Sequence, residues 1–157
     1  MTNNKDGLIE LMATHEETLS QLYQIYSQKY DFYQSFWQDI ASEEIDHARW
    51  LHALNEKADR GELSFDEHLF KLPAITTSLE YLNQKVAQAR MEDIPVLTAL
   101  SISRDLENSM LEGKFFIVFQ TDSPELKKVF SELEDATNLH AHKIKDLLDA
   151  QGQLPVD

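Results

Sequence analysis

Four long stretches of the chain repeat their apolar residues with the 3.6-residue period of an α-helix, at about 8–28, 31–58, 95–120 and 124–150. At 1.5 Å per residue each would span on the order of 30–40 Å, so the expected helices match in length. Residues 75–90 share this periodicity, and we expect an extra helix there, in the connection between the second and third segments. No stretch alternates apolar and polar residues as a half-buried strand does.

Glycine and proline mark where these helices should begin and end. The expected breaks are Gly7, Gly61, Pro95 and Gly152. Ser123 followed by Pro124 is typical of an N-cap with proline at the first helical position. The first and last connections are short, which favours antiparallel neighbours, whereas the middle one, of roughly 35 residues, is long enough to cross the bundle. The sequence therefore predicts an all-α fold, a single antiparallel four-helix bundle domain over residues 1–157.

The charge balance excludes several classes of partner. The chain carries 28 acidic against 14 basic residues, a formal net charge of −14, and has no basic run. This charge repels phosphate backbones and anionic lipid, so we expect neither a nucleic acid nor a membrane as partner. No apolar run approaches the ~20 residues of a transmembrane helix, and the polar start MTNNKDG is unlike a signal peptide. The absence of cysteine excludes thiolate metal ligands and is compatible with the cytoplasm, where we expect the chain to act.

Acids and histidines occur within the apolar stripes of the four segments when each is projected at about 100° per residue. These residues are Glu16, Glu44, His47, Glu107 and His140, with Thr137 beside the last of them. A buried carboxylate is costly unless it is protonated, paired or bound to a metal. Three carboxylates and two imidazoles in one core offset that cost by coordinating cations, and this donor set suits Fe, Mn or Zn.

Glu44 and His47 form a Glu-x-x-His motif, in which a step of three residues places both side chains on one helix face, able to hold one ion. Because glutamate is abundant in this chain, the motif alone is a weak signal. Its position on an amphipathic helix strengthens it, as do Glu16 and Glu107 at the middle of other helices. A buried hydrogen-bonded pair without metal is the other interpretation.

The remaining candidates also have interpretations that involve no metal. Glu107 has Arg104 as an ion-pair partner three residues earlier, and Glu17 competes with Glu16 if the helix register differs by one residue. His140 can donate to a glutamate or be a core histidine with satisfied hydrogen bonds. Thr137 is interpreted as structural. The other histidines and the aromatic residues are given no role in the site: His15, His52, His68, His142, Tyr23, Tyr26, Tyr30, Tyr33, Trp37 and Trp50.

Four segments around these residues match the pattern of a known family. They are residues 16–23 (EETLSQLY), 40–48 (IASEEIDHA), 99–107 (ALSISRDLE) and 130–140 (FSELEDATNLH). The first looks like a glutamate seven residues before a tyrosine, the second like a Glu-x-x-His-Ala helix, and the third like a third-helix ligand segment. Through these segments, over nearly its whole length, the chain resembles the rubrerythrin branch of the ferritin-like family. The second segment is the most specific match.

The resemblance implies a ferritin-like bundle with a dimetal carboxylate site that activates O2 or peroxide, or that stores or oxidises iron. Glu44 would bridge or chelate, His47 would be a nitrogen ligand, and Glu16 and Glu107 would be terminal carboxylates. His140 would be the ligand of the fourth helix. Thr137 stands where the family has the glutamate of a second Glu-x-x-His, so one bridging carboxylate is missing. The cysteine-rich rubredoxin module of rubrerythrins proper is also missing.

Two functions from different classes are therefore predicted. The first is a metal-binding oxidoreductase of peroxidase or ferroxidase type, with one or two iron ions, or with Mn or Zn. The second is a bundle that has lost the full dimetal site and serves as a binding or scaffold module. A spare apolar surface also predicts a homodimer, and its expected members are Phe32, Phe36, Phe115, Phe116 and Phe119.

Overall fold

Five α-helices make up most of the described part of the chain in a computed structural model. The structure describes residues 4–62, 64–65, 72–112, 119–120 and 124–152. The helices are α1 (Asn4–Lys29), α2 (Gln34–Asp59), α3 (Leu72–Met91), α4 (Val96–Glu112) and α5 (Pro124–Gly152). The prediction of an all-α fold is confirmed, and the extra helix expected at 75–90 is α3.

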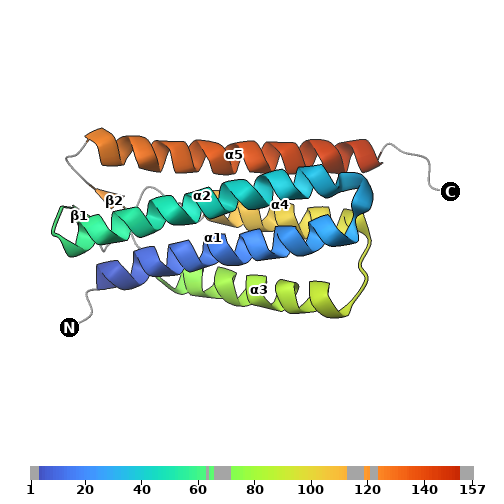
Figure 1. The fold of residues 1–157 in the computed structure, drawn as a ribbon, viewed down its shortest axis with the longest axis horizontal. Coiled ribbons are helices and arrows are strands. Elements are labelled where there is room, and N and C mark those ends of the chain that lie inside the picture. Colours follow the sequence, from blue (N-terminus) through green and yellow to red (C-terminus); the bar gives the residue numbers. More distant parts are fainter. Residues whose placement is uncertain (1–3, 63, 66–71, 113–118, 121–123, 153–157) are drawn as a thin grey trace.

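The helices lie side by side, and each runs opposite to the one before it in the chain (Figure 1). α1 packs against α2 along much of its length and against α3 on another side, and α4 packs against α5. Because α3 runs back along the bundle, α2 and α4 point in the same direction. The long middle connection therefore crosses the length of the bundle as a helix.

The predicted helix ends need two corrections near the N-terminal half. α1 begins at Asn4, so Gly7 lies inside the helix; it is exposed there, and a Cβ would meet nothing within 4 Å. The predicted second segment opens with a 3₁₀ turn, η1 (Asp31–Tyr33), before α2 starts. Gly61 ends α2 as expected, because its φ of 76° allows the Glu62 N–H to donate to the Lys57 carbonyl at 2.9 Å.

The third predicted segment, 95–120, is wrong at its C-terminal end. α4 stops at Glu112, and two residues of that segment form the strand β2 (Phe119–Gln120). It pairs antiparallel with β1 (Ser64–Phe65), so the connections that follow α2 and precede α5 meet. Residues 115–120, FFIVFQ, are rich in aromatic and β-branched residues, which favour extended backbone over helix. The predicted N-cap Ser123 lies outside the described residues.

An aromatic cluster fills the core between α1 and α2. Tyr23, Tyr26 and Trp37 are each 0 % exposed. The ring centroid of Trp37 lies 5.6 Å from that of Tyr23 and 4.9 Å from that of Tyr26. Close contact of the two helices is visible at Ser20, whose hydroxyl donates to the Ala41 carbonyl at 2.8 Å. The prediction that these aromatic residues belong to the core is confirmed.

The phenylalanines expected on a spare surface are only partly described. Phe32 is 89 % exposed, and Phe36 is partly buried against the core. The side chains of the other three, at positions 115, 116 and 119, lie outside the described residues. The homodimer therefore stays a prediction. Among the helices that the structure describes, none has the length and apolar character needed to span a membrane.

Candidate metal centre

The five candidate ligands come from four different helices and meet in the core. α1 supplies Glu16, α2 supplies Glu44 and His47, α4 supplies Glu107, and α5 supplies His140. None of the five is more than 3 % exposed. Each lies on the core-facing stripe of its helix, and the packing of the helices turns these stripes toward one another.

The first group of ligands joins α1 to α2. His47 Nδ1 lies 3.8 Å from Glu16 Oε2 and 3.5 Å from Glu44 Oε2. One ligand atom from each of the three residues lies within 4.8 Å of the other two. A step of three residues along α2 brings Glu44 and His47 together, as their spacing in the sequence predicts.

The second group of ligands joins α2 to α4 and α5. His140 Nδ1 lies 2.6 Å from Glu44 Oε1 and 3.6 Å from Glu107 Oε1, and ligand atoms of these three residues again lie within 4.8 Å of one another. Glu44 belongs to both groups, with Oε2 facing His47 and Oε1 facing His140. The two imidazole rings stack with centroids 5.6 Å apart. The two groups are therefore adjacent halves of one centre.

Several buried oxygens of this centre lack a hydrogen-bond donor among the described residues. They are Glu16 Oε2, Glu44 Oε2 and Glu107 Oε2. Buried polar atoms in proteins are nearly always hydrogen-bonded, so three such oxygens in one place call for another partner. A divalent cation fits, because carboxylate oxygen and imidazole nitrogen are the donors that first-row metals take. The residues present thus suit a metal ion.

The electrostatics of the metal-free centre depend on His140. Burial disfavours the charged imidazole, but the carboxylates of Glu107 and Glu44 outweigh it and raise the pKa of His140 to about 11. Burial also disfavours the Glu44 carboxylate, yet His140 and His47 lower its pKa below the ordinary value. Burial and the charge of Glu44 raise the pKa of Glu107 to about 7. Without a metal, a proton on His140 compensates the buried negative charge in place of a cation.

The structure decides between the alternatives that the sequence left open. Glu16 is buried, whereas Glu17 is exposed and its Oε1 lies 2.7 Å from His52 Nε2. Arg104 contacts Asp105 at 3.4 Å, on the exposed side of α4, so it is not the partner of Glu107. The register that places Glu16 in the core is therefore the right one.

Thr137 is buried beside the centre without contributing a carboxylate. It is 1 % exposed, and its hydroxyl donates to the Leu133 carbonyl of its own helix at 2.9 Å. This local bond satisfies the hydroxyl, which agrees with the interpretation of Thr137 as structural. The centre therefore has three buried carboxylates.

Three residues near the centre had no predicted role. Tyr23 donates to Glu107 Oε1 at 2.8 Å, Glu43 contacts His140 Nε2, and His15 lies 2.8 Å from the Ser78 hydroxyl of α3 through its Nε2. Burial lowers the pKa of His15 to about 4, opposed by the charge of Glu44, so it is neutral at pH 7. Tyr23 follows Glu16 by seven residues on one face, which is a signal the sequence offered. Glu43 had no signal beyond being next to Glu44.

Removal of the Tyr23 hydroxyl is expected to destabilise the protein. Burial and the neighbouring Glu107 raise the pKa of Tyr23 well above its ordinary value, so it remains a donor at all ordinary pH values. In Tyr23→Phe one buried carboxylate oxygen loses that donor, and we expect the free energy of unfolding to fall by about 1.5–3 kcal/mol in urea titrations of metal-free protein. Tyr33→Phe, at a half-buried position, is the control and should change it by much less. Equal losses in the two variants would contradict this role.

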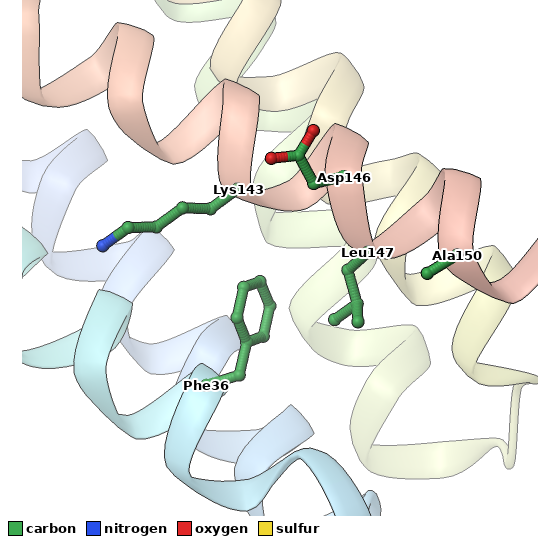
Figure 2. A pocket seen from close by; sticks show the side chains of 5 residues that line it. All are labelled: Phe36, Lys143, Asp146, Leu147 and Ala150. Carbon is green, nitrogen blue, oxygen red and sulfur yellow. The ribbon is translucent and has the colours of Figure 1, made fainter.

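An open pocket of about 330 Å³ lies between α2 and α5, away from the candidate ligands. Phe36 from α2 lines it together with four residues of α5, namely Lys143, Asp146, Leu147 and Ala150. Figure 2 shows the Phe36 ring rising toward α5 and the Leu147 side chain pointing back toward α2. None of the five candidate ligands lines this pocket, so it is a separate surface feature.

Comparisons of the chain with protein-family models, with curated proteins and with solved structures find no match. The chemistry of the buried centre is therefore the basis for assigning a function.

Proposed function

We propose that this chain is a ferritin-like, rubrerythrin-like protein that binds one or two iron ions among α1, α2, α4 and α5 and acts in the reduction of O2 or peroxide or in iron handling. The observation that carries the proposal is the shared position of Glu44, which belongs to two adjacent buried groups of ligands. Each group adds one carboxylate and one imidazole to it. Two such groups around one carboxylate are suited to a pair of cations with a bridging ligand.

The donor set favours iron among the metals considered. Each half of the centre offers two carboxylates and one imidazole nitrogen, and the chain has no cysteine. Carboxylate and imidazole donors with open positions suit Fe, while Mn and Zn also accept them. When bound, iron supplies the redox chemistry. In this proposal Glu44 bridges, His47 and His140 give nitrogen, and Glu16 and Glu107 are terminal.

The chain's own residues prepare the centre by excluding water and by fixing the ligands. All five ligands are nearly inaccessible to solvent, so electrostatic interactions within the centre are strong. Tyr23 holds Glu107 by a hydrogen bond at 2.8 Å. Because Thr137 adds no carboxylate, two cations would share Glu44 alone as a bridging residue.

The arrangement of the helices supports the ferritin-like part of the proposal. The four helices that supply ligands are α1, α2, α4 and α5, and α3 lies within the connection that crosses the bundle (Figure 1). Ferritin-like bundles have one such crossover and build their metal sites from side chains of facing helices.

A second candidate is a bundle that works without metal as a binding or scaffold module. The close approach of His140 Nδ1 to Glu44 Oε1, at 2.6 Å, favours it, because a charged imidazole balances a carboxylate without a cation. The two candidates differ in what happens when metal is offered.

Metal content after anaerobic loading tests the proposal. Purified protein is incubated with Fe(II), desalted, and analysed for iron per chain. We expect two irons if both halves bind, or one if the missing carboxylate at Thr137 leaves a single site; consumption of peroxide or O2 is the next assay. Glu56→Gln, which changes an exposed acid of α2, should load like the wild type. A chain that retains no iron would contradict the proposal and favour the scaffold.

A further inference from the structure

Glu43 connects the buried centre to the protein surface. It precedes Glu44 on α2 and reaches across to α5, where its Oε2 contacts His140 Nε2. The Glu43 side chain is 43 % exposed, whereas the His140 side chain is 0 % exposed. One imidazole thus lies between a carboxylate that solvent reaches and two carboxylates, Glu44 and Glu107, that it does not.

The two nitrogens of His140 face different partners, which fixes what each can do. Nδ1 faces Glu44 and Glu107, at 2.6 and 3.6 Å, and Nε2 faces Glu43. A neutral imidazole can bind a cation through Nδ1 only if its proton is on Nε2. A carboxylate that accepts a hydrogen bond from Nε2 selects this tautomer, fixes the orientation of the ring, and makes Nδ1 a better donor to a metal.

The two halves of the centre differ in this respect. Both carboxylates paired with His47, those of Glu16 and Glu44, lie nearest its Nδ1. The imidazole of His140 has, in addition, a carboxylate at its outer nitrogen. A change at Glu43 should therefore act on the half that contains His140 and spare the half that contains His47.

We infer that Glu43 is a positioning residue that holds His140 with Nδ1 directed at Glu44 and Glu107, and that it thereby sets the metal affinity of that half of the centre. This inference rests on the proposed function, because it concerns an ion bound between these three residues. Glu43 suits the role because solvent reaches it, so that its charge is not buried with the others.

Anaerobic titration with Co(II), followed by calorimetry and by visible absorption, tests the inference. If the wild type binds two ions, Glu43→Gln should bind one with unchanged affinity and the other about 10- to 100-fold more weakly. If the wild type binds one, the inference expects that affinity to fall by the same factor. Asp46→Asn is the matched control, because it removes another exposed, paired acid from the same turn of α2 and should change neither affinity.

Two further readouts separate positioning from a structural role. In Zn(II)-loaded wild type, ¹⁵N spectra should show the His140 proton on Nε2, and Glu43→Gln should alter the ring signals of His140 but not those of His47. The urea midpoint of metal-free Glu43→Gln should stay close to that of the control. Unchanged Co(II) affinities in Glu43→Gln, or equal weakening of both ions, would overturn the inference alone. A wild type that binds no Co(II) would overturn it together with the proposed function.

Discussion

Glu44→Gln is expected to remove metal from both halves of the centre in a single substitution. Glutamine keeps the size of the side chain but loses the charge, and Glu44 is the residue that the two ligand groups share. After anaerobic Fe(II) loading and desalting, iron per chain should fall from the wild-type value to nearly none. Bound metal also stabilises a fold, by about 2.7 kcal/mol when its free concentration is 100 times Kd. The increase in unfolding temperature on adding Fe(II) should vanish in the variant.

Single changes at the terminal carboxylates provide the comparison. Glu16→Gln and Glu107→Gln each alter one group only, so each should lower iron per chain by about half of what Glu44→Gln removes. If Glu44→Gln responds to Fe(II) as the wild type does, in both content and stability, Glu44 is no ligand and the scaffold function is favoured.

Thr137→Glu should make the fold depend on metal. Thr137 is 1 % exposed and lies three residues before His140, on the same face of α5, where a second Glu-x-x-His would place its glutamate. A fourth carboxylate in this core, without a cation, is an unpaired buried charge. We expect it to lower the free energy of unfolding by about 3–5 kcal/mol in metal-free protein. Fe(II) should restore most of this loss and bind more tightly than in the wild type.

Thr137→Gln separates the charge from the size of the new side chain. It fills the same volume without adding a charge, so any steric cost appears in both variants, and only the glutamate should gain from metal. Urea unfolding of the two variants with and without Fe(II) measures the difference. An equal response of the two to Fe(II) would show that position 137 does not face a bound cation.

The sequence alone determined the helices and the direction in which their polar residues point. The 3.6-residue period reflects one helix at a time, so α1, α2, α3 and α5 were predicted within a few residues of their ends. The same projection placed all five candidate ligands in apolar stripes, and all five are buried. It failed at β2, because pairing with residues 64–65 depends on a partner more than fifty residues away.

Only the tertiary structure decided which of these residues meet. A projection gives the angle of a side chain about its own helix, but the contacts between helices depend on how the helices rotate and slide against one another. The hydrogen bond from Tyr23 to Glu107 spans 84 residues, and the contact of Glu43 with His140 spans 97. The sharing of Glu44 between two ligand groups likewise requires α2 to lie between α1 and α5 at one height. Such long-range geometry results from the packing of all the side chains together, which no single segment of the sequence specifies.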